Sequence, residues 1–193
     1  MVRNPQRRAA LADAAIEVLA REGARGLTFR AVDAEAGVPA GTASNYFADR
    51  DALFVQVGDR VYERLQPDSA AVAETLKGAR DRERVTELMY ELTDRVSAYR
   101  SGFLALVELR LESTRRPGLR TVLTRAISAD VDANVTAHRA SGLPGDDTAV
   151  VLLYLALNWL IMERLTLPDV FPEPRIHDLV AELVERVLPP DAP

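Results

Sequence analysis

Residues 42–46, Thr-Ala-Ser-Asn-Tyr, form the group of side chains best suited to bind a ligand through hydrogen bonds. Thr42, Ser44, Asn45 and Tyr46 each carry a hydroxyl or an amide that can both donate and accept. Base edges in the major groove of DNA are read by such side chains when a helix presents them. The run therefore predicts contact with nucleic acid, provided that it lies on an exposed helix.

The sequence before this run predicts two short helices joined by a glycine turn. Thr28 is a suitable N-cap for a helix over 29–36, whose apolar residues share one face. Gly37 supplies the turn, and Pro39 is expected to open the next helix because a proline in a first turn loses no hydrogen bond. Such a pair can place its second helix in the major groove, which is about 12 Å wide.

Ala43 and Phe47 are the residues expected to anchor this second helix. They are four positions apart and therefore share a helix face. Ser44 and Asn45 would then point outward. The alternative is a helical hairpin whose outer face is polar without any nucleic-acid function, because few basic residues lie within the helix itself.

Basic residues near the N-terminus could supply affinity that short polar side chains do not. Residues 1–50 contain seven arginines and six acids, whereas the whole chain has a net charge of −5. Arginines bind phosphates of any sequence and so contribute affinity rather than sequence reading. The arginines expected at the rim of this interface are Arg3, Arg7, Arg8, Arg30 and Arg50.

Other groups of residues offer little catalytic or metal chemistry. Glu108 and Glu112 share a helix face at i, i+4, where they could form an acid–base pair or an ion-pair network with nearby arginines. The chain has no cysteine and two histidines, and no acid lies three or four residues from His138. We therefore expect no enzyme, no cofactor and no metal site.

Helical periodicity runs through almost the whole chain, and β alternation is absent. This predicts an all-α fold of about nine helices, with residues 67–80 left ambiguous. The longest apolar run, 149–162, has about 14 residues, fewer than the roughly 20 of a membrane span. We expect a buried helix there and no membrane partner. The N-terminus lacks an apolar signal segment, so a cytoplasmic protein is expected.

Two C-terminal helices carry enough apolar surface to join two subunits. The helix over about 146–166 is apolar on every side and is expected to be buried on several faces, and a second apolar stripe runs from Ile176 to Leu188. We expect both in a four-helix homodimer interface, the alternative being a core within one chain. The residues predicted for the interface are Leu153, Leu157, Leu160, Ile176, Leu179, Val180, Leu183, Val184 and Val187.

The sequence of residues 8–55 is specific enough to compare with the signature of a known protein family. Its features are Leu27-Thr28, the Ala36-Gly37-Val38 turn, Gly41-Thr42, the Tyr46-Phe47 pair, and the acidic-basic-acidic-Ala-Leu start of the fourth helix. These features resemble the N-terminal signature of the tetracycline-repressor (TetR) family of bacterial regulators. The rest of the chain is similar to that family only in its length and its helical pattern.

This resemblance implies a three-helix, helix–turn–helix DNA-binding domain at 1–50 and a helical effector-binding and dimerisation domain at 51–193. By position, Thr28 and Arg30 would contact phosphates, residues 42–46 would face bases or backbone, and Arg50 replaces a lysine common in the family. Pro39, Ala40 and Ser44 depart from the family pattern, which reduces direct contacts and leaves the operator sequence open.

The expected function is a ligand-responsive repressor, a homodimer on a palindromic operator of double-stranded DNA that a small apolar or amphipathic effector releases. The alternative is a helical ligand-binding or partner-recruiting protein with weak or no specific DNA binding. The effector would bind among the middle helices, where any inward-facing side chain could instead belong to the core. The residues predicted for the effector pocket are Met89, Tyr90, Phe103, Val107, Tyr154, Asn158, Trp159 and Met162.

Overall fold

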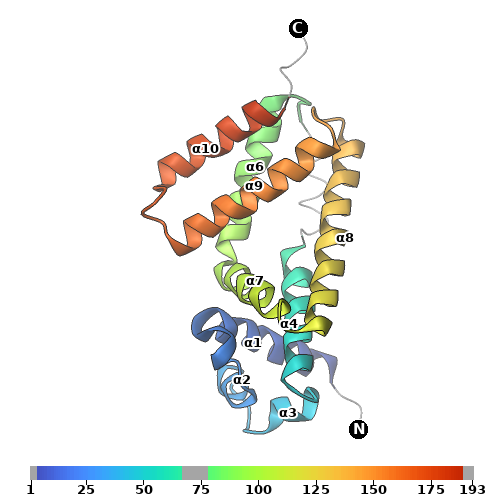
Figure 1. Ribbon diagram of the computed structural model, residues 1–193, viewed down its shortest axis with the longest axis vertical. Helices are drawn as coiled ribbons and strands as arrows, with labels where there is room; N and C mark the ends of the chain where they lie inside the picture. The colour runs from blue at the N-terminus through green and yellow to red at the C-terminus, as the bar shows by residue number, and fades with distance from the viewer. Residues whose placement is uncertain (1–3, 67–77, 189–193) are drawn as a thin grey trace. The chain divides into compact units, whose positions relative to one another are not determined.

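The computed structural model describes residues 4–66 and 78–188, and these ranges contain nine α-helices and no strand (Figure 1). The prediction of an all-α fold with about nine helices is confirmed. Arg3 and most of the ambiguous segment 67–80 lie outside the described residues. The helices are α1 (Pro5–Gly26), α2 (Phe29–Glu35), α3 (Thr42–Tyr46), α4 (Arg50–Leu65), α6 (Arg82–Ala98), α7 (Arg100–Ser113), α8 (Pro117–Ser141), α9 (Asp147–Thr166) and α10 (Glu173–Val187).

The chain forms two compact units whose limits differ from the predicted boundary at residue 50. Within the described residues, the first unit comprises α1 to α4, α7 and the part of α8 up to Ile127. The second comprises α6, the rest of α8, α9 and α10. The boundary differs because α4 and α7 pack against α1 and share its core, so the helix–turn–helix is one part of a larger unit.

Local signals at the helix ends explain most of the first unit. The Asp49 side chain accepts from the Ala52 N–H at 2.7 Å and caps α4. Gly23 kinks α1 at a φ of +67°, and the helix resumes as far as Gly26. Pro39 does not open α3, because its carbonyl accepts from the Thr42 N–H in a turn and the helix begins only after it.

The core of the first unit holds the helix–turn–helix against α1, α4 and α7. Ala43 and Phe47 are 0% and 1% exposed, which confirms that these two residues anchor the short third helix. Phe54 of α4 and Leu109 of α7 are fully buried in the same cluster. The polar face of α3 is therefore fixed by apolar contacts on its opposite side.

Helix α9 of the second unit buries one face only, which corrects the expectation of burial on several faces. Ala149, Leu153, Leu157 and Ile161 recur at four-residue spacing and are buried. This side of α9 packs against α6 and α10, whereas residues on other sides of the helix remain exposed. By length and composition α9 could cross a membrane, a property that it shares with core helices of folded domains.

Truncating Phe54 tests how much the first unit depends on this core. Phe54→Ala should lower the free energy of unfolding by roughly 3–5 kcal/mol, because it removes a fully buried ring and leaves a cavity. Leu111→Ala, at a side chain that is 56% exposed, should change it by less than about 0.5 kcal/mol. Urea unfolding measures both. Equal losses in the two variants would contradict the assigned core.

Candidate nucleic-acid interface

The helix–turn–helix is held by bonds from side chains to the backbone. Thr28 accepts from the Ala31 N–H at 3.1 Å and caps α2 as expected. No side chain at the N-cap Gly41 caps α3. Asp33 of α2 takes that role instead, with its two carboxylate oxygens each 2.7 Å from a backbone nitrogen, those of Gly41 and Ala43. Sequence reasoning missed Asp33, because nothing in the local pattern shows that its side chain reaches across the turn.

The outward side of α3 carries the polar residues predicted to read bases. Ser44 and Asn45 are exposed, and Thr42 and Tyr46 are half-buried. The hydroxyls of Thr42 and Ser44 donate to the carbonyls of Pro39 and Gly41, at 2.6 and 2.9 Å. The Asn45 side chain makes no hydrogen bond within the described residues, so its amide keeps its full capacity to donate and accept.

Two of the arginines predicted to bind phosphate, Arg8 and Arg50, make hydrogen bonds within the protein. Arg8 donates to the Gln56 side chain at 2.6 Å and to the Tyr46 carbonyl at 3.1 Å, and it lies over the Phe47 ring. Arg50 donates to the Leu27 carbonyl at 3.0 Å and to the Ala24 carbonyl. Both guanidinium groups thus support helix ends, which their position in the sequence did not indicate.

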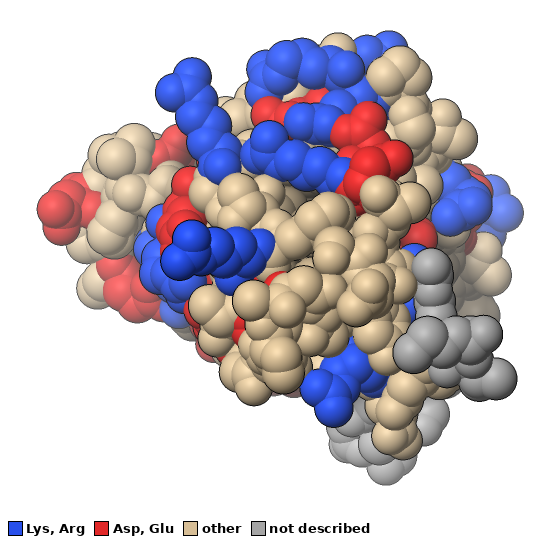
Figure 2. Space-filling model, turned by 90° about the horizontal axis from the view of Figure 1, so that it is seen from below, with Lys and Arg blue, Asp and Glu red and all other residues tan. Residues whose placement is uncertain are grey.

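Arg7 and Arg30 are the predicted phosphate contacts that remain available. Both are exposed, and neither makes an ion pair or hydrogen bond through its side chain within the described ranges. Figure 2 shows the face that carries α2 and α3, where basic side chains, with acidic ones beside several of them, lie around a surface of mostly uncharged residues. This arrangement suits a neutral reading surface with cations at its margin.

An ion-pair cluster centred on Glu112 supports the beginning of α4. Arg115 and Arg116 donate to the two oxygens of Glu112, at 2.6 and 2.8 Å, and Arg116 also pairs with Asp51 of α4. The Arg116 guanidinium lies over the Phe54 ring, 4.5 Å from its centroid. The bonds from Arg115 and Arg116 outweigh burial and hold the pKa of Glu112 below its usual range.

Glu108 and Glu112 therefore do not act as a pair. Glu108 accepts from the Ala24 N–H at 3.1 Å, directly after the Gly23 kink in α1, so it replaces a hydrogen bond that the kink removes. Glu112 belongs to the ion-pair network that the sequence offered as the alternative. Within the described residues no group of three or more side chains could hold a metal ion.

The residues predicted for the effector pocket are divided between the two units. Phe103 is buried in the first unit, where Val107 is half-buried. In the second unit Tyr90 stacks on His177 at 3.7 Å, and Trp159 is 65% exposed. The other predicted residues of this unit, Met89, Tyr154, Asn158 and Met162, are half-buried.

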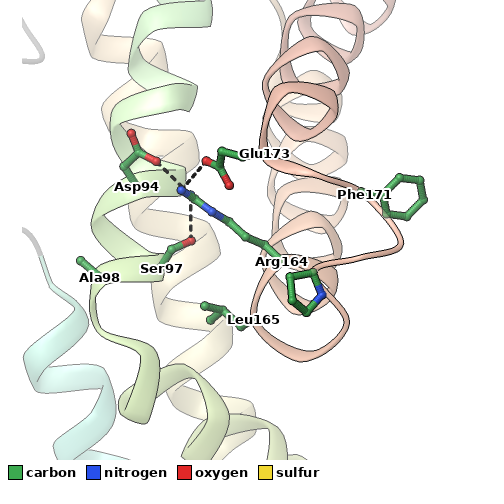
Figure 3. Close-up of a pocket in the computed structure, with 8 residues that line it drawn as sticks. Asp94, Ser97, Ala98, Arg164, Leu165, Phe171 and Glu173 are labelled. Carbon is green, nitrogen blue, oxygen red and sulfur yellow. Dashed lines mark hydrogen bonds and ion pairs between the residues drawn. The ribbon is translucent and has the colours of Figure 1, made fainter.

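A pocket of about 670 Å³ lies in the second unit, and none of the predicted residues lines it (Figure 3). Arg164 of α9 crosses it and donates to Asp94 at 2.9 Å, to Ser97 at 3.2 Å and to Glu173 at 2.5 Å. Its lining residues are Asp94, Ser97, Ala98, Arg164, Leu165, Pro168, Phe171 and Glu173. The pocket thus combines one guanidinium and two carboxylates with apolar groups, a set that α6, α9 and α10 bring together from distant positions.

Five of the nine residues predicted for the dimer interface are buried inside the chain, which corrects that part of the assignment. Leu153, Leu157, Ile176, Val180 and Val184 are at most 6% exposed and fill the core of the second unit, so no surface of theirs is left for a partner. The remaining four, Leu160, Leu179, Leu183 and Val187, are half-buried. The large exposed apolar side chains of α9 are Leu152, Leu155 and Trp159.

Comparison with known proteins gives a consistent assignment for both parts of the chain. Residues 11–57 match the model of bacterial regulatory proteins of the tetR family, and residues 80–190 match the model of the tetracyclin repressor-like C-terminal domain. No curated protein matches by sequence.

Several solved structures share the fold over nearly their whole length. A TetR family member from Streptomyces coelicolor A3 is 29% identical, with a TM-score of 0.69, covering 96% of this chain and 99% of that one. The multidrug binding protein EbrR complexed with ethidium is 28% identical, with a TM-score of 0.66 and coverages of 95% and 99%. A transcriptional regulator from Rhodococcus sp. Rha1, 16% identical, shows the same fold, with a TM-score of 0.74 and coverages of 93% and 95%.

The Glu112 cluster should make stability depend on pH in the acid range. Because its pKa in the folded state lies below the ordinary value of 4.5, Glu112 stabilises the fold above that pH and ceases to do so as the pH falls through the lower value. Glu112→Gln should therefore lower the Tm at neutral pH and converge on the parent protein in acid. Asp169→Asn, at an exposed acid, should follow the parent at every pH. A Glu112→Gln deficit that persists unchanged in acid would contradict the charged network.

Proposed function

This chain belongs to the tetR family of bacterial regulatory proteins, and on that premise we propose that it is a transcriptional repressor that binds a palindromic operator as a homodimer. A small effector releases it from DNA. The family consists of regulators rather than enzymes, and a regulator of this kind works in the cytoplasm, where the DNA is. The observation that carries the proposal is the exposed Asn45 and Ser44 on a helix whose opposite side is anchored by Ala43 and Phe47.

In this proposal the side chains of α3 recognise the DNA sequence, and the arginines beside α3 supply most of the affinity. Asn45 can bond an adenine through both its amide donor and its carbonyl acceptor, and Ser44 can bond several bases. Arg7 and Arg30 neutralise phosphates beside the groove without distinguishing sequences. Because α3 itself holds no lysine or arginine, specific binding depends on few direct contacts per subunit.

A second subunit compensates for so small a reading surface. Two half-sites about one DNA turn apart double the contacts when the protein has two-fold symmetry. The apolar surface of α9 at Leu152, Leu155 and Trp159 supports a dimer contact, since such side chains gain by leaving water. The half-buried residues predicted earlier on α10, such as Leu183, are candidates for its margin.

The effector is proposed to be apolar or amphipathic, and the pocket at Arg164 is one place where it could bind. The related protein EbrR was solved as a multidrug binding protein with ethidium, and 28% identity over most of both chains supports a similar class of ligand here. Phe171 and Leu165 offer apolar contact, whereas Asp94 and Glu173 are paired with Arg164, so a cationic group would have to compete with that guanidinium for them. A ligand shifts the protein from DNA only when it prefers the conformer that binds DNA poorly.

Helix α4 is the element proposed to transmit this preference to the reading helix. Its first residues are bonded to the end of α1 through Arg50 and to α7 through Asp51, Arg116 and Glu112. A movement of α4 therefore either carries α1 with it or breaks these bonds. If α4 carries α1 with it, the distance between the two DNA-binding units of the dimer no longer matches the half-site spacing. If the bonds break, the helix–turn–helix is held less firmly.

A ligand-binding or partner-recruiting protein with weak DNA binding is the second candidate. It is favoured by the internal use of Arg8 and Arg50, which lowers the number of free cations near α3. A gel shift with DNA fragments that flank the coding region separates the two. Salt-sensitive binding to one fragment supports the repressor, and binding to none supports the second candidate.

Reading and phosphate contacts should respond differently to substitution. Arg30→Ala should weaken binding to every duplex alike and reduce the salt slope by about one, because one phosphate contact is lost. Asn45→Ala should change the preferred sequence and leave the slope unchanged. Arg186→Ala, an equal loss of charge on α10, is the control. Fluorescence anisotropy over several salt concentrations measures all three, and parental behaviour in both test variants would contradict the assigned interface.

A charge introduced into the exposed apolar surface of α9 should dissociate the dimer into monomers. Trp159→Glu should convert a dimer to a monomer at micromolar concentration in sedimentation velocity, because an apolar contact would have to bury an unpaired carboxylate. Leu111→Glu, at a similarly exposed leucine on α7, should leave the dimer intact. A dimeric Trp159→Glu protein would move the interface away from this face.

A further inference from the structure

Helix α3 lacks a cap of its own. It has five residues, and its N-cap is Gly41, which has no side chain and a φ of +90°. The first N–H groups of a helix have no partner within it and must find acceptors elsewhere. The Thr42 N–H bonds the Pro39 carbonyl at 3.2 Å, whereas the N–H groups of Gly41 and Ala43 need an acceptor from another element.

Asp33 of the neighbouring helix α2 accepts hydrogen bonds from both of these N–H groups. Its Oδ2 accepts from the Gly41 N–H and its Oδ1 from the Ala43 N–H, both at 2.7 Å. The residue is 2% exposed, so the two bonds are shielded from water. Bonds to a charged acceptor are shorter and stronger than neutral ones, and a carboxylate is favoured at a helix N-terminus.

We propose that Asp33 is a positioning residue that sets the orientation of α3 for DNA reading, and thereby the sequence specificity of the protein. This inference rests on the proposed function. A helix as short as α3 does not persist alone in water, so its direction depends on what holds its ends. Two bonds to backbone atoms two residues apart fix both its axis and its rotation. Ser44 and Asn45 follow Ala43 directly, so any rotation of α3 redirects them.

The same bonds determine how α3 can meet DNA. Backbone N–H groups at a helix N-terminus often bind phosphate, but here the carboxylate of Asp33 occupies two of them. Reading therefore depends on the side chains of α3, and phosphate binding depends on the arginines at its margin. Asp33 affects the ratio of specific to non-specific binding rather than the salt dependence.

The test compares two duplexes of equal length, one selected by the parent protein from a randomised library and one unrelated. Asp33→Asn keeps the shape of the side chain but can accept only one of the two bonds. It should bind the selected duplex about tenfold more weakly, while binding to the unrelated duplex and the salt slope stay unchanged. Glu35→Gln removes an exposed acid of the same helix and should match the parent protein.

Amide hydrogen exchange separates positioning from general loss of stability. In Asp33→Asn the amides of Gly41 and Ala43 should exchange faster, while amides in the core helices α1 and α4 keep their parental rates. A serine at position 39 can accept from the Gly41 N–H two residues later. In Asp33→Ala/Pro39→Ser, part of the specificity lost in Asp33→Ala should therefore return.

Parental binding of the selected duplex by Asp33→Asn, or unchanged exchange at Gly41 and Ala43, would overturn the positioning role. Faster exchange throughout α1 and α4 would overturn it as well, since Asp33 would then stabilise the unit as a whole. If the parent protein selects no sequence, the proposed function fails, and the reading role of Asp33 fails with it. The exchange data would still show whether Asp33 caps α3, so the two failures can be told apart.

Discussion

A helix of five residues such as α3 cannot hold its own shape in water, and the first unit is organised around this constraint. Ala43 and Phe47 bury its inner side in the core that α1, α4 and α7 build. Asp33 bonds its first backbone groups from α2. The side chains proposed to read DNA can then be few and small, because residues of the core and of α2 fix their positions.

Charge in this unit is used mainly to join helix ends. Arg50 satisfies carbonyls at the end of α1, Glu108 satisfies an amide at its kink, and Arg116 links α4 to α7. Partly buried pairs of this kind hold a specific geometry more effectively than exposed pairs do. The cost is that fewer cations remain for phosphate, which fits the net charge of −5 and the proposal that two subunits share the binding of DNA.

Local pattern predicted the parts of this structure that depend on neighbours in the sequence. The anchors Ala43 and Phe47 follow from four-residue spacing, and the N-cap Thr28 follows from capping chemistry. The partners of Arg50 lie 23 and 26 residues away, and no sequence pattern distinguishes a carbonyl there from a phosphate on DNA. The prediction that α9 is buried on several faces was wrong for a related reason. This helix is apolar all round, so periodicity could not show which side would be buried against α6 and α10 and which would carry Trp159.

We propose that α3, anchored on its inner side by Ala43 and Phe47, reads DNA with its outer side chains. A set of ¹⁵N–¹H spectra of the protein with and without a duplex that it has selected from a randomised library tests this proposal. We expect the largest shifts at the amides of Ser44 and Asn45 and at the side-chain amide of Asn45, with smaller shifts at Arg30. Shifts that avoid residues 42–46, or a protein that selects no duplex at all, would contradict it.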